Sequence, residues 1–201
     1  GNVSFPSTVN GNVAATRTLT VTAGTGTVNF GGVVGGLFSL LSLTVTATGG
    51  ITLTGDVTTS TTQSYTGLVT LAASSVLTGT VPTFSAGVAG AGFDLTLNFS
   101  GLTTIDGLLF TGINNLASGN GGTTQLTGNI STTGTQTYND AVTLSGSTTL
   151  TTTDDAVSFA AAVDAAGAGV QSLTITAGLG TVGFTGAVGA VNRLNVLTVN
   201  S

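Results

Sequence analysis

The sequence predicts an all-β protein folded as a parallel β-helix, a β-solenoid of about eight coils of about 25 residues each. Composition is the first observation behind this prediction: Thr, Val, Leu and Gly dominate, while the helix formers Lys, Glu and Met are missing. The second is the alternation of apolar with small polar residues, which is typical of strands. The third is a recurring unit, in which a Phe is followed four positions later by a Val and then by a segment such as LTVT.

The recurring unit has a short period of about 25 residues. The spacing from Phe5 to Phe30 equals the spacing from Phe159 to Phe184. The five copies begin with Phe5, Val9 and Leu19; Phe30, Val34 and Leu43; Phe84, Val88 and Leu95; Phe159, Val163 and Leu173; and Phe184, Val188 and Leu197. Because each coil of a solenoid completes the core of its neighbour, we expect Phe5 to stack on Phe30 and Leu19 on Leu43.

A longer period lies over the short one. Residues 3–45 align without a gap on residues 157–199 at an offset of 154, and residues 53–71 match residues 126–144 at an offset of 73. The supercycle is therefore about 76 residues, and every third unit carries a Tyr (Tyr65, Tyr138) in place of the Phe pattern. The main alternative is a tandem of two or three β-sandwich domains of about 76 residues. The short subperiod favours a solenoid, so residues 1–201 are predicted to be one continuous repeat module.

The first unit shows two strands. Residues 3–9 alternate apolar and small polar side chains, and Gly11 with Asn12 supplies a turn. The segment TLTVTAG then places Leu19 and Val21 on one face of a strand. The glycines that follow mark the next corner of the coil.

Two later segments resemble helices when they are read alone. Residues 33–43 are almost continuously apolar, but their copy at residues 187–197 carries an Arg and two Asn. Residues 154–169 have an Asp at the start, an Ala-rich body and a Gly stop, but their copy carries Pro6 and Gly11, which oppose a helix. Since repeats share a backbone, we expect no buried helix in the first segment and strands in the second.

The central units follow the same pattern. Residues 53–80 form the first Tyr unit, residues 83–112 repeat the Phe pattern, and residues 125–153 form the second Tyr unit. A three-residue shortening between Val88 and Leu95 predicts a loop, and GNGG at residues 119–122 predicts a turn. The inward-facing candidates of the first Tyr unit are Val57, Tyr65, Val69, Leu71 and Leu77.

The alternation of LTVTAGTGTVNFGGVVG with GDVTTSTTQSYTGLVTL resembles the β-strand repeats of very large bacterial secreted proteins of the filamentous-haemagglutinin and autotransporter-adhesin kind. The likeness covers nearly the whole chain. It implies a right-handed parallel β-helix in a secreted or cell-surface fibre. It also implies adhesion to other cells or to their surface glycans.

The charge and composition bound the partners. A net charge of -5 with two Arg and no Lys makes nucleic acid and anionic membrane surfaces poor partners, and no apolar run is long enough to span a bilayer. The absence of Cys excludes a disulfide scaffold and a thiolate metal site. A Cys-free and Lys-free repeat rich in Thr, Gly and Asn is expected of a bacterial exoprotein.

No catalytic, cofactor-binding or metal-binding residue is predicted. Enzymes built on β-helices gather Asp with Lys, Arg or His on one face, whereas the seven Asp of this chain are scattered. Asp154 and Asp155 are adjacent, so on a strand they point to opposite faces. We expect these two residues and Asp140 to be solvated turn residues rather than calcium ligands. The glycine clusters are expected at corners of the coil.

Two repeated polar features remain. The pairs Thr20 with Thr22 and Thr44 with Thr46 are expected to form a flat grid, of the kind that orders water or ice, although Thr also suits an ordinary solvent face. Tyr65 and Tyr138 occur at the same phase, which favours a structural role, packing on one another's equivalents in a longer fibre, over stacking on sugars.

The sequence therefore predicts a non-enzymatic stalk or shaft of an extracellular bacterial adhesin or fibre. The chain starts and stops inside the repeat, so we expect it to be part of a longer array. The alternative is a self-assembling filament or surface-layer subunit that stacks end to end on identical subunits. Ice binding and polysaccharide cleavage are less favoured.

Overall fold

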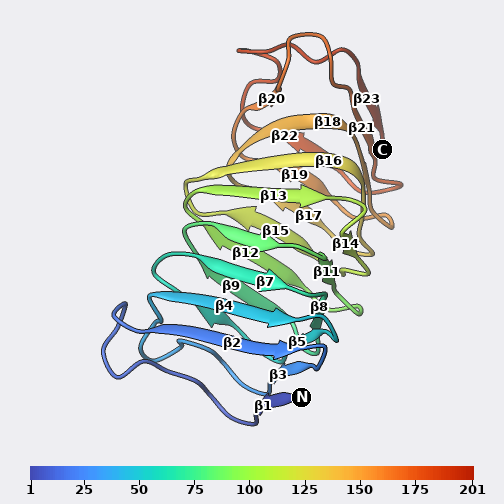
Figure 1. The fold of residues 1–201 in the computed structure, drawn as a ribbon. Coiled ribbons are helices and arrows are strands. Elements are labelled where there is room, and N and C mark those ends of the chain that lie inside the picture. The colour runs from blue at the N-terminus through green and yellow to red at the C-terminus, as the bar shows by residue number, and fades with distance from the viewer.

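The computed structural model describes all residues 1–201 and confirms the predicted fold class. The chain contains no helix and winds into a β-solenoid of about nine turns, with every strand pairing parallel (Figure 1). At about 4.8 Å per turn, nine turns make a rod about 43 Å long. One continuous core cluster of 36 buried residues extends from Val21 to Ala177, which excludes separate sandwich cores.

The strands form four stacked sheets. Sheet I contains β1 (Val3–Phe5), β3 (Val28–Phe30), β5 (Ile51–Leu53), β8 (Val69–Leu71), β11 (Val88–Ala89) and β14 (Phe110–Thr111). Sheet II contains β2 (Thr18–Gly24), β4 (Ser42–Ala47), β7 (Gln63–Thr66) and β10 (Pro82–Phe84). Sheet III contains β6 (Val57–Thr58), β9 (Ser75–Gly79), β12 (Leu95–Phe99), β15 (Leu116–Gly119), β17 (Gln136–Tyr138), β19 (Val157–Phe159) and β22 (Val182–Phe184). Sheet IV contains β13 (Leu102–Asp106), β16 (Thr123–Ser131), β18 (Ala141–Thr151), β21 (Leu173–Thr176) and β23 (Leu197–Asn200), with β20 (Val163–Ala165) also paired to β18.

Coil length is less uniform than the sequence period. Val3 pairs with Val28, a full sequence period further along the chain, whereas Ile51 pairs with Val69 after a clearly shorter stretch. The longer coils occur near the two ends, and the central coils are shorter because their corners are shorter. The structure therefore has about nine turns rather than eight.

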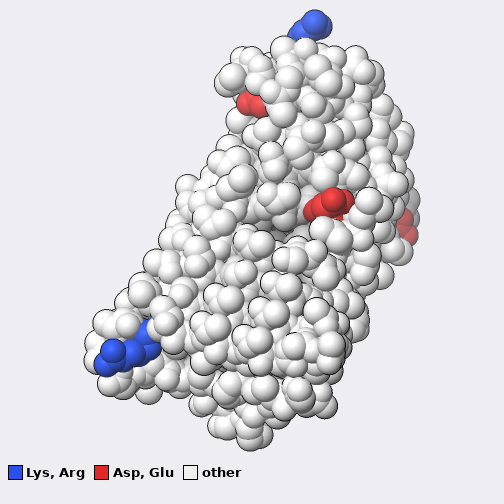
Figure 2. All heavy atoms as spheres, viewed as in Figure 1, with Lys and Arg blue, Asp and Glu red and all other residues white.

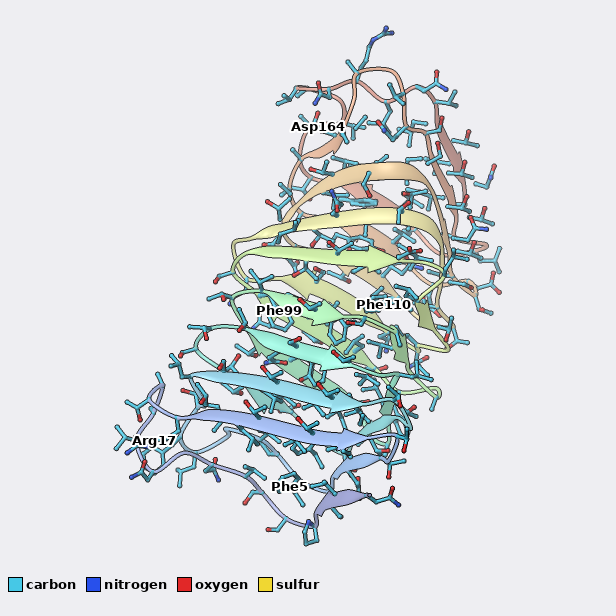
Figure 3. All side chains as sticks on the ribbon, in the orientation of Figure 1. Phe5, Arg17, Phe99, Phe110 and Asp164 are labelled. Atoms are coloured by element: carbon cyan, nitrogen blue, oxygen red, sulfur yellow. The ribbon has the colours of Figure 1, made fainter.

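Like residues stack inside the coils as expected. Phe5 lies on Phe30 with ring centroids 5.1 Å apart, and Leu19 pairs with Leu43. Phe159 and Phe184 stack at 4.9 Å near the other end. Phe99 points into the interior of its coil (Figure 3) and is fully buried. The five inward-facing candidates of the first Tyr unit are all buried.

The two helix-like segments are not helical. Residues 154–169 contain the strands β19 and β20. Residues 33–41 form bends and isolated bridges that lead into β4. Both predictions are therefore confirmed, and so are the loop between Val88 and Leu95 and the turn at residues 119–122.

The sequence copies occupy different sides of the solenoid. At the offset of 154, β1 of sheet I corresponds to β19 of sheet III, and β2 of sheet II corresponds to β21 of sheet IV. The strand β21 lies above sheet I rather than above sheet II. It pairs with the second half of β18, which pairs with the second half of β16, and β16 contacts β14 of sheet I. The longer period is therefore not a whole number of coils, and one sequence builds more than one face.

A buried hydrogen-bond network crosses the coil interior at the first Tyr unit. The hydroxyl of Tyr65 donates to Oε1 of Gln63 at 2.8 Å. Nε2 of Gln63 donates to the carbonyls of Val57 and Thr78, at 3.1 and 2.8 Å. The Gln63 amide thus joins one coil to the next while both its polar atoms are satisfied in a dry interior.

The second Tyr unit repeats the same network further along the chain. Tyr138 donates to Gln136 at 2.9 Å, and Gln136 donates to the carbonyls of Ile130 and Thr151. Burial raises the pKa of each tyrosine hydroxyl far above the usual range for tyrosine. A structural role is confirmed, but the expected stacking partner is wrong. Each Tyr stacks on the Phe of the next coil, at 5.3 Å for Tyr65 on Phe84 and 5.2 Å for Tyr138 on Phe159.

We expect Tyr65→Phe to lower the free energy of unfolding by about 1–3 kcal/mol, because it keeps the ring stack but leaves a buried amide oxygen unpaired. Chemical denaturation followed by circular dichroism measures this change. Ser64→Ala is the matched control, since Ser64 lies on the same strand and its side chain makes no hydrogen bond. Equal losses in the two variants would show that the network adds no stability.

Candidate functional site

The solenoid contains one dislocation, at residues 102–111. The first part of this segment, β13, pairs only with the following coil through β16. The second part, β14, pairs only with the preceding coil through β11. Sheets I and II end here and sheet IV begins, so the ladder between neighbouring coils is open on both sides of the segment.

Pro82 gives a physical reason for the opening below β13. Ser85 donates its backbone N–H to the carbonyl of Tyr65, and the backbone N–H of Gln63 donates to the carbonyl of Val81, so the odd-numbered residues of this stretch face β7. Backbone groups alternate in direction along a strand, so Pro82 faces β13. Proline has no N–H to donate, and it is found on the edge strands of sheets.

The first cleft lies between β10 and β13. Its volume is about 230 Å³. Phe84, Leu109 and Phe110 supply apolar surface, and Asp106 supplies a carboxylate whose Oδ1 accepts the backbone N–H of Leu108 at 2.9 Å. The remaining lining residues are Pro82, Thr83 and Thr104.

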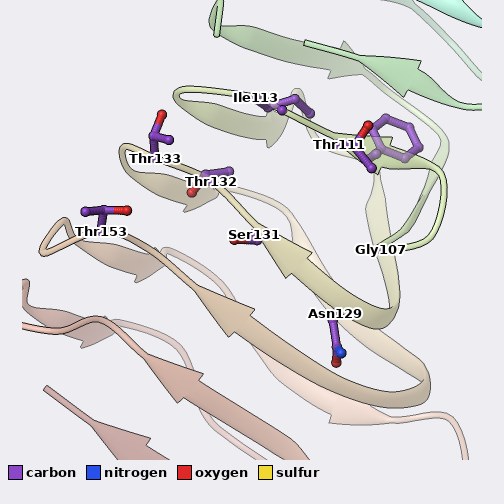
Figure 4. Close-up of a pocket in the computed structure, with 10 residues that line it drawn as sticks. Gly107, Thr111, Ile113, Asn129, Ser131, Thr132, Thr133 and Thr153 are labelled. Carbon is purple, nitrogen blue, oxygen red and sulfur yellow. The ribbon is translucent and has the colours of Figure 1, made fainter. Parts of the chain in front are cut away.

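The second cleft lies on the opposite side of the segment, between β14 and β16 (Figure 4). Its volume is about 250 Å³, and Phe110 and Ile113 are its two apolar residues. The polar residues around it are Thr111, Asn129, Ser131, Thr132, Thr133 and Thr153, with Gly107 and Gly112 completing the wall.

Phe110 contributes to both clefts and packs edge-on against Phe84, with ring centroids 5.5 Å apart. Phe110 itself is only 3% exposed, so the aromatic surface that a ligand could reach is that of the half-buried Phe84 in the first cleft. That ring, beside hydroxyl and carboxylate oxygens, can bind a small polar ligand by stacking and hydrogen bonding, whereas the second cleft offers mainly hydroxyl and amide groups. Sequence reasoning assigned no residue here. The available signal was Pro82, placed inside a strand of the repeat.

A polar ladder runs along one corner of the coils. The backbone N–H of Asp94 donates to Oγ of Ser74 at 3.1 Å. Oδ1 of Asp94 accepts from Nδ2 of Asn114 at 2.8 Å, and from Nδ2 and the backbone N–H of Asn115 at 2.9 and 3.1 Å. Asn115 then accepts from the backbone N–H of Thr135 at 2.8 Å. These side chains therefore join four successive coils where the strands are interrupted.

Other Asp side chains cap single coils. Oδ1 of Asp56 accepts the backbone N–H of Val76, Asp154 accepts that of Leu179, and Asp164 accepts those of Val191 and Asn192. Each acceptor belongs to the coil before its donor. The scattered positions of the Asp residues thus correspond to corners at which a backbone N–H needs a partner.

The expectation for Asp140 is wrong. This residue is only 5% exposed, so it is not a solvated turn residue. Its Oδ1 accepts the backbone N–H of Gly121 at 2.7 Å, while Oδ2 is buried without a partner. Asp154 is exposed as expected, and the structure shows no group of three or more His, Cys, Asp or Glu that could hold a metal ion.

The Thr grid is present and has a second copy. In sheet II, Thr20 pairs with Thr44 and Thr22 with Thr46, and the grid continues to Ser64 and Thr66. A second grid on sheet IV consists of Thr149, Thr174 and Thr198 beside Thr151, Thr176 and Asn200. Both grids face outward, because the residues that alternate with them, such as Val45 and Ile175, are core residues.

No protein family, curated protein or solved structure matches this chain. No helix with the length and hydropathy of a membrane span occurs in it. Charged side chains are sparse on the face shown in Figure 2, where a few isolated Arg and Asp side chains interrupt a neutral surface.

We expect the backbone amides that face the first cleft to exchange their hydrogens fast. Phe84 and Thr104 point their N–H groups into the open ladder, by the same alternation that places Pro82 there. Leu97 is the control, since its strand β12 pairs with β9 on one side and with β15 on the other. Hydrogen exchange followed by NMR measures the rates, and equal protection of the three amides would contradict an open ladder.

We also expect an acid-sensitive contribution from Asp94. Burial raises the pKa of this carboxyl, but hydrogen bonds from Asn114, Asn115 and Ser74 outweigh burial and hold the pKa below its ordinary value of 3.8. Its stabilising contribution is therefore complete above that value and is lost as the pH falls through the lower pKa of the folded state.

Asp94→Asn should flatten the fall of the melting temperature in this acid range. Thermal melts at a series of pH values measure the effect. Asp155→Asn is the control for the loss of one carboxylate, since the hydrogen bond that Asp155 accepts goes to its backbone carbonyl and not to its side chain. The same flattening in both variants would argue against a specific role of the ladder.

Proposed function

We propose that this chain is a non-enzymatic, rigid stalk segment of an extracellular bacterial fibre. The observation that carries the proposal is the in-register stacking of about nine coils on one uninterrupted core. Each coil buries its apolar face only against its neighbours, so the stack is stiff along its axis and extends by adding coils.

The polar residues support a structural role. The carboxylates of Asp56, Asp94, Asp154 and Asp164 are engaged with backbone groups of the next coil. The duplicated Gln–Tyr networks join adjacent coils through buried amides. These side chains hold the stack together at points that strand pairing alone leaves open.

The extracellular bacterial location and the adhesive setting rest on the sequence resemblance to the repeats of large secreted adhesins. Glycans of a partner cell are the ligands that this setting suggests. The first cleft, where the half-buried ring of Phe84 lies beside the hydroxyl groups of Thr83 and Thr104, is the sugar-binding site that this setting favours. Antibody labelling of intact and of lysed cells of the source organism tests the location.

We expect a spin-label pair placed near the two ends to report one narrow distance distribution. The chain has no Cys, so Thr20→Cys on β2 and Thr174→Cys on β21 provide unique, outward-facing attachment points. Pulsed electron resonance measures the distance. A broad distribution would contradict a rigid stalk. The pair Thr20→Cys with Thr44→Cys, on directly paired strands, is the short-distance control.

End-to-end assembly into a filament is the alternative, and sedimentation of the same samples over a range of concentrations distinguishes it from a stalk. A monomer at all concentrations would favour the stalk, whereas polymers would favour the filament.

A specific observation favours one further candidate, which is binding to ice. The two Thr grids offer regularly spaced hydroxyl groups on strands that pair in parallel from coil to coil. Thermal hysteresis in a freezing assay, lost in a Thr44→Lys variant, would favour this function over a stalk.

A further inference from the structure

The chain contains two Asn-Gly dipeptides, Asn10–Gly11 and Asn120–Gly121. The backbone nitrogen of a residue after Asn can attack the Asn side-chain carbonyl, and Gly permits this most readily because it has no side chain in the way. The structure surrounds the two dipeptides very differently.

Asn120 is held in a strained and exposed state. Its φ of 117° lies in the region that favours glycine, and it is the residue with the largest positive φ among the non-glycine residues of the chain. Its side chain has one hydrogen bond, from Nδ2 to the carbonyl of Asn98, which is long at 3.4 Å. The side-chain carbonyl carbon is therefore free to turn toward the nitrogen of Gly121.

A buried carboxylate faces the attacking nitrogen. The backbone N–H of Gly121 donates to Oδ1 of Asp140 at 2.7 Å, and Oδ2 of the same carboxylate is buried without a partner. A carboxylate at hydrogen-bond distance from the N–H of the nucleophile is placed to accept its proton. Asp140 has no counterpart in the first Tyr unit, where Gly67 stands at the matching position.

We propose that Asn120 is a site of self-catalysed deamidation, with Asp140 as the general base. The Gly121 nitrogen attacks Cγ of Asn120 and its proton passes to Asp140. The new N–Cγ bond closes a succinimide, and the Cγ–Nδ2 bond breaks as the proton returns to the departing nitrogen, which leaves as ammonia. Water then opens the succinimide to aspartate or isoaspartate at position 120.

Asn10 supplies a matched comparison inside the same chain. Its Oδ1 accepts the backbone N–H of Leu37 at 2.9 Å, which fixes the side chain as a cap on the next coil. The N–H of Gly11 donates to the carbonyl of Phe38 at 3.2 Å, so a neutral carbonyl stands where Asp140 stands in the other dipeptide. The same two residues are thus held unreactive at one corner and poised at the other.

The modification would alter the corner between β15 and β16. A carboxylate at position 120 takes the net charge of the chain beyond -5 and places a second negative group near the buried Asp140. Like charges near one another repel, and isoaspartate lengthens the backbone at the turn. Deamidation would therefore loosen this corner as the protein ages.

The test is to incubate the folded chain at mildly alkaline pH in heavy-oxygen water and to map deamidation by chymotryptic digestion and mass spectrometry. We expect Asn120 to react several-fold faster than Asn10 in the folded chain, and both to react at similar rates in denaturant. Equal folded-state rates, or a faster reaction at Asn10, would overturn the proposal.

Asp140→Asn tests the base, since it keeps an acceptor oxygen but cannot take the proton. We expect a several-fold slower reaction at Asn120 in this variant, with the melting temperature recorded to establish that it is folded. An unchanged rate in the folded variant would overturn the role of Asp140. If the variant does not fold, the comparison of Asn120 with Asn10 in the unaltered chain still decides whether the site is poised.

Discussion

The structure depends on one constraint, which is that every coil must complete the backbone ladder and the core of its neighbours. No coil can bury its apolar residues alone, so like side chains recur in vertical columns, as Phe5 on Phe30 and Phe159 on Phe184 show. The same constraint governs the polar residues. Where a strand is interrupted at a corner, an Asp or Asn side chain supplies the hydrogen-bond acceptor that strand pairing does not provide there.

The interior of the rod is not uniformly apolar. Gln63 and Gln136 each stand in a column of apolar residues, and each satisfies its amide through a Tyr hydroxyl and two carbonyls. A buried amide in this setting fixes the register of adjacent coils, because a shift by one residue would leave its polar atoms without partners. The repetition of the network in the second Tyr unit indicates that register, rather than packing volume, is what these positions specify.

Much of the fold could be predicted from the sequence because the repeats can be compared with one another. The Ala-rich segment at residues 154–169 would pass for a helix by itself, and only its copy with Pro6 and Gly11 shows that it cannot be one. Coil length was harder to predict, since corners can shorten without disturbing the inward-facing residues. The burial of Asp140 was not predictable either, because its copy at Gly67 has no side chain to compare.

The clefts beside Phe110 arise from a relation between coils rather than from any local motif, and therefore only the position of Pro82 pointed to them.

A further consequence follows from the mismatch between the sequence period and the coil. A duplicated segment returns on another side of the rod, as the Thr pairs of β2 do in β21. An outward feature that is copied with the repeat therefore faces different directions on the same rod, as Thr20 of β2 and Thr174 of β21 do. A partner that recognised the feature would find copies of it on more than one side.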